Sequence, residues 1–211
     1  GFKVCDVTQG IPLPDSSVDA LIVHRMRDEM PDPLVRENLL RELSRILKPN
    51  GLVSFIEDLY IEPSDPEGDW YRKRYNVSRK VAEHFLDRLI QDHHLPSSFG
   101  HILDDQNYRV MLSLRDRRGE KMNEADYDKK EQELINKINT GEVVIRGIGL
   151  HESKDHVIDS FLKLGFSLQD QWNVLMPQSG FREGHSNVMK GFLFKKESGA
   201  RLAKETPFHP K

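Results

Sequence analysis

The chain has 211 residues, 37% of them apolar and 31% charged, with a net charge of −3 and a single cysteine. This length allows one domain with a real core, or one domain with a large insertion. The composition excludes an intrachain disulfide, since Cys5 has no partner, and argues against a dedicated nucleic-acid binder, which is usually basic overall. No apolar run approaches the roughly 20 residues that span a membrane, so we expect a cytoplasmic protein.

Residues 10–58 predict a strand, a helix and a second strand. Residues 18–23 are almost wholly apolar, which is typical of a strand buried on both faces of a parallel sheet. Asp32 can cap a helix that begins at Pro33. That helix has one apolar stripe at helical spacing, formed by Val35, Leu39, Leu40, Leu43, Ile46 and Leu47. Residues 48–51 end the helix, and residues 52–56 predict the second buried strand, so the helix is a crossover of the length that a parallel pair needs.

The remaining elements predict an α/β fold with an insertion. Residues 2–7 predict a short strand that ends at Asp6, before a loop up to Asp15. Residues 63–139 show no strand pattern and predict a helical insertion, with helices over 77–95 and 125–138. Residues 142–150 are extended in character. Residues 151–164 predict a helix with Val157, Ile158, Phe161 and Leu162 turned inward and Gly165 at its end.

A long antiparallel hairpin is predicted near the end of the chain. Its strands cover residues 166–176 and 187–195, joined by a loop over 177–186. The expected domains are therefore an α/β core over 1–62 and 140–196, an insertion or lid over 63–139, and a loose tail over 197–211.

Three motifs resemble the second half of class I S-adenosylmethionine-dependent methyltransferases. The first is Leu13-Pro14-Asp15 with Ser17-Val18-Asp19, before the first apolar strand. The second contains Leu43, Arg45, Leu47, Lys48, Pro49 and Gly51, with Asn50 where glycine is common. The third is Leu164-Gly165-Phe166, before the terminal hairpin. The resemblance covers about residues 1–60 and 150–195, and it implies a Rossmann-like methyltransferase sheet and S-adenosylmethionine as cofactor.

The resemblance also implies roles for individual residues. Asp6, with Val7 beside it, matches the acidic position that contacts the adenine of the cofactor. His24, Arg25 and Met26 match the loop that touches the methionine part of the cofactor. His24 is the catalytic candidate, as a general base whose reference pKa lies near ~6.5, although a packed side chain at a strand end is the alternative.

The acceptor is expected on the same side of the fold. The candidate substrate residues are Arg27, Asp28, Glu57, Asp58, Trp70 and Tyr71. Many small-molecule members carry a pair of histidines in this loop, where the present chain has Asp28 and Glu29. The aromatic and cationic stretch 70–79 would suit an RNA acceptor, or is a solvated helix start with snorkelling side chains. No metal-ligand pattern is present, so we predict no metal site.

One part of the family pattern is missing upstream of Asp6. The family has a glycine-rich cofactor loop after its first strand, and its sheet order of 3-2-1-4-5-7-6 places strands one and two between strands three and four. We therefore expect an upstream segment or a partner chain to complete the sheet, or else a non-catalytic interaction module. Gly147-Ile148-Gly149 is either a connector into the next helix or a permuted cofactor loop.

Overall fold

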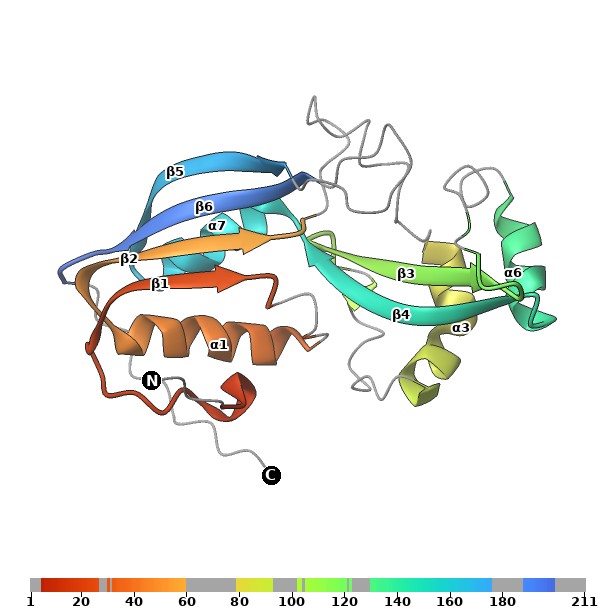
Figure 1. Cartoon of the computed structure of the whole chain (residues 1–211), viewed down its shortest axis with the longest axis horizontal. Helices are drawn as coiled ribbons and strands as arrows, with labels where there is room; N and C mark the ends of the chain where they lie inside the picture. The colour runs from red at the N-terminus through yellow and green to blue at the C-terminus, as the bar shows by residue number, and fades with distance from the viewer. Residues whose placement is uncertain are drawn as a thin grey trace. The chain divides into compact units, whose positions relative to one another are not determined.

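The computed structural model of the chain describes residues 5–26, 30, 32–59, 79–92, 102–103, 105–120, 122, 130–175 and 188–199. The chain forms two compact units (Figure 1). The sheet unit comprises Gly1–Arg25, Leu34–Glu57 and Val157–Lys211, and the second unit comprises Met26–Pro33 and Asp58–His156. The boundary expected near residue 140 differs from this division, because residues 140–156 lie in the second unit.

The sheet unit contains a four-stranded sheet in the order β1-β2-β6-β5. Its strands are β1 (Val18–His24), β2 (Leu47–Glu57), β5 (Phe166–Leu175) and β6 (Val188–Lys196). β1 and β2 are parallel and joined by α1 (Pro33–Ile46), whereas β6 runs antiparallel to both β2 and β5. The expected Rossmann-like sheet with a terminal antiparallel hairpin is thereby confirmed.

The turn between α1 and β2 is tighter than the sequence predicted. β2 begins at Leu47 rather than at residue 52, and Val18 pairs with Leu47 before a register shift. Asn50 takes a left-handed conformation with φ of 63°, which asparagine tolerates better than most residues. At the next residue, Gly51, a Cβ would come within 2.7 Å of the Leu47 Cγ, so position 51 requires glycine.

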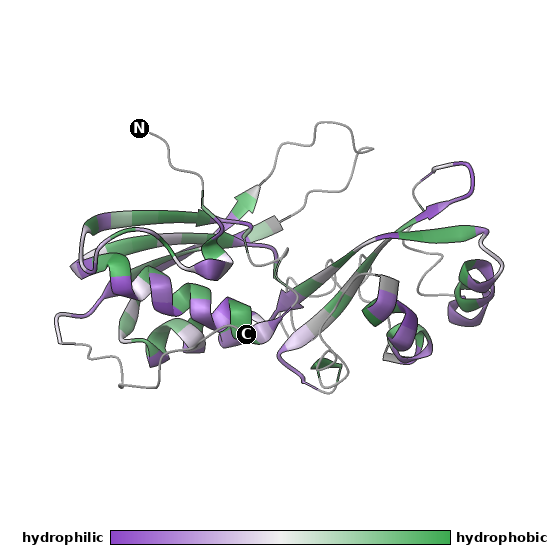
Figure 2. Ribbon diagram, turned by 90° about the horizontal axis from the view of Figure 1, so that it is seen from below, coloured by the Kyte–Doolittle hydropathy of each residue, from purple (hydrophilic) through white to green (hydrophobic). Residues whose placement is uncertain are grey.

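The core of the sheet unit is aromatic. Phe161 of α7 (Lys154–Lys163) stacks on Phe194 at 3.9 Å between ring centroids. It also meets Phe55 and Phe166 edge to face at 5.2 and 5.4 Å. Lys196 shares the face of Phe194, because alternate strand residues point the same way, and its amine reaches the carbonyls at the end of α1. Both helices therefore cover the same side of the sheet (Figure 2).

The opposite side of the sheet corrects one prediction. The strand over residues 18–23 is not buried on both faces, since Ile22 is 82% exposed whereas its neighbour Val23, which points to the other face, is 2% exposed. Leu52 and Trp172 are also exposed. The continuous apolar run had predicted burial on both faces. In the described part of this unit, one of those faces is instead apolar and exposed to solvent.

Two neighbouring substitutions in β1 test this arrangement. Val23→Ala should lower the free energy of unfolding by about 1–3 kcal/mol, because it removes buried methyl groups. Ile22→Ser should change it by less than about 0.5 kcal/mol, since this side chain contacts mainly water. Urea denaturation of the two variants provides the measurement. An equal loss in both would mean that the open face is covered in solution.

The second unit has its own core and its own sheet. β3 (Tyr108–Asp116) pairs antiparallel with β4 (Val143–Glu152), and α3 (Arg79–Asp92) and α6 (Glu131–Asn139) supply helices. Among the described residues of this unit, the buried core consists of Val81, Phe85, Leu89, Ile102, Tyr108, Val110, Leu112, Leu114, Leu134, Ile135, Ile138, Val143 and Leu150.

Three predictions for this region are corrected. The stretch 63–139 is not purely helical, because β3 lies within it; the prediction overlooked the strand alternation of the buried residues Tyr108, Val110, Leu112 and Leu114. Gly147 and Gly149 lie inside β4, opposite Ser113 and Met111, so they do not form a permuted cofactor loop. The helix expected from residue 151 begins at Lys154, because β4 continues to Glu152. The loop over 177–186 lies outside the described residues, as does the tail from residue 200.

Candidate functional site

The carboxyl edge of the two parallel strands, β1 and β2, carries polar side chains. In open α/β sheets, ligands bind at the carboxyl ends of the strands. β1 ends at His24 and β2 ends at Glu57. His24 is the register partner of Ile56, so the exposed imidazole and the buried Glu57 carboxylate, 3% exposed, stand at one edge but on opposite sides of the sheet.

Arg25 turns the chain away from the sheet at this edge. Its N–H donates to the Ile56 carbonyl at 2.9 Å, which adds one bond to the ladder, while its φ of 50° is left-handed. A left-handed non-glycine residue is uncommon and often marks a functional turn. Met26 follows half-buried in the second unit, whereas Arg27 and Asp28 lie outside the described residues.

Asp6 lies in a turn rather than at the end of a strand. Residues 1–4 lie outside the described part of the chain, and Val7–Gln9 form a 3-10 helix, η1, that Asp6 caps. The Asp6 Oδ1 accepts bonds from the Thr8 hydroxyl at 2.6 Å and from the Thr8 N–H at 3.0 Å. These two bonds, the hydroxyl first, lower the pKa of Asp6, so the exposed carboxylate is ionised at neutral pH. Both described bonds end on Oδ1, which leaves Oδ2 for an external donor.

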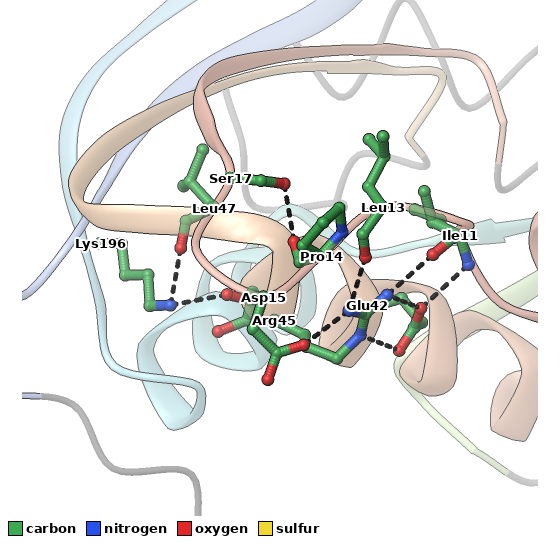
Figure 3. A network of polar contacts seen from close by, with 10 residues as sticks. Ile11, Leu13, Pro14, Asp15, Ser17, Glu42, Arg45, Leu47 and Lys196 are labelled. Carbon is green, nitrogen blue, oxygen red and sulfur yellow. Dashed lines mark hydrogen bonds and ion pairs between the residues drawn. The ribbon is translucent and has the colours of Figure 1, made fainter. Parts of the chain in front are cut away.

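A polar network holds the loop that follows this turn against α1 (Figure 3). The Arg45 guanidinium donates to the carbonyls of Ile11 and Leu13, both at 2.8 Å, and to the Asp15 carboxylate at 2.7 Å. It also forms a fork with Glu42, at 2.8 Å for each bond. The Glu42 carboxylate in turn accepts the Ile11 N–H at 2.9 Å. The loop between the Asp6 turn and β1 is therefore fixed by side chains of the crossover helix.

Charge and hydrogen bonding reinforce one another in this network. The hydrogen bond from Arg45 lowers the pKa of Glu42 against an opposing effect of burial. The bonds to Glu42 and then to Asp15 raise the pKa of Arg45 further above its usual range. Nearby, burial lowers the pKa of Lys196, whose amine donates to the Ser44 carbonyl at 2.6 Å and the Leu47 carbonyl at 2.9 Å. Lys196 thus donates to one carbonyl in the last turn of α1, where carbonyls lack partners within the helix, and to the carbonyl of the first residue of β2.

Sequence reasoning missed Glu42 and Lys196 of this network, and also two further charged residues of the sheet unit. Arg36 is 1% exposed, on the same stripe of α1 as Leu40, and only its position one turn before that leucine could have signalled it. Lys190 of β6 pairs with Glu57 of β2 on one side and with Asn173 of β5 on the other. Cross-strand partners share a face, so Glu57 and Lys190 are neighbours of opposite charge.

The other predicted substrate residues are not brought together by the described structure. Asp58 is half-buried and begins the second part of the second unit, while Trp70 and Tyr71 lie outside the described residues. In the second unit, the Tyr108 hydroxyl lies 3.1 Å from the His156 Nε2. No three metal-ligating side chains gather among the residues that the structure describes. Within those same residues, no helix has the length and apolarity to cross a membrane.

The comparisons with known proteins agree with this geometry. A family model described as a methyltransferase domain matches residues 1–55. A solved S-adenosylmethionine-dependent methyltransferase from Methanosarcina mazei superposes with a TM-score of 0.53 at 18% identity. That alignment covers 93% of this chain and 66% of the other. The resemblance that the sequence suggested is confirmed for the fold and for residues 1–55.

Two further solved structures are more distant. A putative S-adenosylmethionine-dependent methyltransferase from Listeria monocytogenes has a TM-score of 0.43 at 13% identity, covering 90% of this chain and 67% of its own. A glycopeptide N-methyltransferase complexed with S-adenosyl-L-methionine has a TM-score of 0.45 at 13% identity, covering 90% and 58%. The comparison with curated proteins gives no match.

Proposed function

We propose that this chain, which has the fold of class I S-adenosylmethionine-dependent methyltransferases, is the substrate-side part of such an enzyme and transfers a methyl group to a small-molecule or RNA acceptor. The observation that carries the proposal is the parallel pair β1–β2, with the Asp6 turn before it and polar residues at its carboxyl edge. The chain spans 66% of the length of the Methanosarcina methyltransferase, so the whole activity is part of this proposal.

The residues present fit the cofactor at one recognisable point. Asp6 is exposed, its pKa is lowered by Thr8, and its second oxygen is available to a donor. An ionised carboxylate on a capped turn suits the exocyclic amine of an adenine, with the backbone of Val7 beside it. His24, Arg25 and Met26 would border the methionine part, where the left-handed turn at Arg25 opens the chain away from the sheet.

The chemistry asks more of geometry than of side chains. S-adenosylmethionine supplies a methyl group on a sulfonium, and its transfer is an in-line displacement that depends on alignment and the exclusion of water. A base is needed only where the acceptor must lose a proton. His24 is exposed at the end of β1 and can take that proton. Glu57, buried on the other side of the sheet, would help to shape the edge rather than to act as the base.

The proposal extends to the acceptor residues, the cellular location and the completion of the cofactor site. Glu57, Asp58, Arg27 and Asp28 are candidates for the acceptor side, and Trp70 and Tyr71 would join them for an RNA acceptor. We place the protein in the cytoplasm. An additional segment or a partner chain over the open side of β1 would complete the cofactor site. A non-catalytic module with the same fold is the second candidate, favoured by the exposed apolar face around Ile22.

Binding of S-adenosylhomocysteine separates the enzyme from the module. At 100 times its dissociation constant, this product should stabilise the full-length protein by about 2.7 kcal/mol. Asp6→Asn should weaken the binding, because it replaces an ionised acceptor by an amide. Asp19→Asn, at an exposed position near the start of β1, is the control and should leave the binding unchanged. Thermal unfolding with and without ligand provides the readout. No shift in the full-length protein would contradict the enzymatic function.

A further inference from the structure

We propose that Arg45 and Glu42 of α1 are positioning residues for the cofactor, through the loop that they fix and not through contact with the ligand. This inference rests on the proposed function, because it concerns the same Asp6 turn. The pair lies on the crossover helix, and its contacts reach across the sequence to Ile11, with Glu42 at a separation of 31 positions and Arg45 at 34.

Both peptide groups of Ile11 are held by this pair. Its N–H donates to Glu42 Oε2 at 2.9 Å, and its carbonyl accepts from Arg45 Nη2 at 2.8 Å. A single backbone position is thus clamped from two sides by two side chains that are also bonded to each other. Bonds to charged groups are the stronger class, and the planar guanidinium fixes their directions.

The clamp lies directly after the turn that presents Asp6. The Gly10 N–H closes the turn on the Val7 carbonyl, and Gly10 takes a φ of 104° that favours glycine. A Cβ at Gly10 would lie 3.6 Å from Glu42 Oε2, so the chain passes close to the pair as it leaves the turn. The Asp6 turn is exposed and has no buried residue of its own. Its place relative to β1 is therefore set by the anchored loop rather than by packing.

The second anchor lies further along the same loop. Arg45 Nη1 donates to the Leu13 carbonyl at 2.8 Å and to Asp15 at 2.7 Å, and the Ser17 hydroxyl donates to the Pro14 carbonyl at 2.6 Å. The backbone N–H of Ser17 then donates to the Ile46 carbonyl at 2.8 Å. Arg45 therefore links the loop that follows the Asp6 turn to the end of α1 (Figure 3).

The test measures binding of S-adenosylhomocysteine by titration calorimetry, at a temperature where every variant is folded. Arg45→Met should raise the dissociation constant about tenfold, equal to about 1.4 kcal/mol. Arg45→Lys keeps the charge but not the fork, and should raise it by a smaller factor. In turnover, KM for S-adenosylmethionine should rise while kcat at saturation is unchanged, because the reacting groups are untouched.

A matched control lies on the same helix. Arg41 forms an exposed ion pair with Glu37 at 2.8 Å, so Arg41→Met removes an arginine of α1 away from the clamped loop and should leave the dissociation constant unchanged. If the unaltered protein binds no S-adenosylhomocysteine, the proposed function fails. If it binds, and Arg45→Met lowers the melting temperature but binds equally well, the pair is merely structural and this inference is overturned. Should Arg45→Met not fold, Arg45→Lys decides in the same way.

Discussion

Replacing Phe161 with alanine is expected to lower the free energy of unfolding of the sheet unit by about 3–5 kcal/mol, the usual cost of removing a buried aromatic ring. The ring is fully buried and touches three other rings, stacked on Phe194 and edge to face on Phe55 and Phe166. The substitution therefore removes apolar contact from α7, β2, β5 and β6 together, and it leaves a cavity that a tightly paired sheet cannot close.

Leu162→Ala is the matched control for this substitution. Leu162 is the next residue of α7 and is 47% exposed, so its loss should cost less than about 1 kcal/mol. Denaturant unfolding followed by circular dichroism measures both variants. Equal losses would mean that α7 presents a different face to the sheet. The sequence had placed Phe161 and Leu162 both inward, and the exposure of Leu162 corrects that prediction.

The second large effect is a pH dependence of the free energy of unfolding that arises from the Glu42 carboxylate. Glu42→Gln should lower the free energy of unfolding by about 1–2 kcal/mol at pH 7, since the carboxylate accepts charged bonds but is 26% exposed. The pKa of Glu42 is lowered in the folded protein, chiefly by the Arg45 bond. A lowered folded pKa adds stability above the ordinary value of 4.5, and that stability is lost as the pH falls through the folded value.

The difference between the unaltered protein and Glu42→Gln should therefore be largest at neutral pH and shrink on acidification. Glu37→Gln is the control, because Glu37 forms an exposed pair with Arg41 and should contribute less than about 0.5 kcal/mol at any pH. Urea midpoints at pH 7 and at several values below 4.5 give the comparison. A difference that stays constant with pH would mean that the carboxylate does not act through its charge.

The sequence by itself determined the elements with strong local patterns. The apolar run before His24, the stripe of α1 beginning at Pro33, and the end of α7 just before Gly165 all lie where periodicity and turn chemistry predicted. Together with the motif around Arg45, they were enough to identify the methyltransferase fold. These features depend on neighbours a few positions apart, so they can be read without knowledge of the rest of the chain.

Only the tertiary structure decided what these elements face. The apolar run predicted burial of Ile22 and Val23 alike. The sheet buries Val23 and exposes Ile22 because neighbouring strand residues point to opposite faces, and α1 and α7 cover only one of them in the described part of the chain. Likewise, only the fold shows that β3 pairs with β4, because the partner strand lies far along the sequence.

The candidate site depends even more on distant partners. The sequence identified Asp6 and Arg45 as parts of motifs, but it predicted a strand end for the first and no partner for the second. The folded chain makes Asp6 the cap of a turn and brings Arg45 to the carbonyls of Ile11 and Leu13, more than 30 positions away. Hydrogen bonds over such separations leave no periodic trace in a sequence, because the fold brings together a loop and a helix that are not neighbours along the chain.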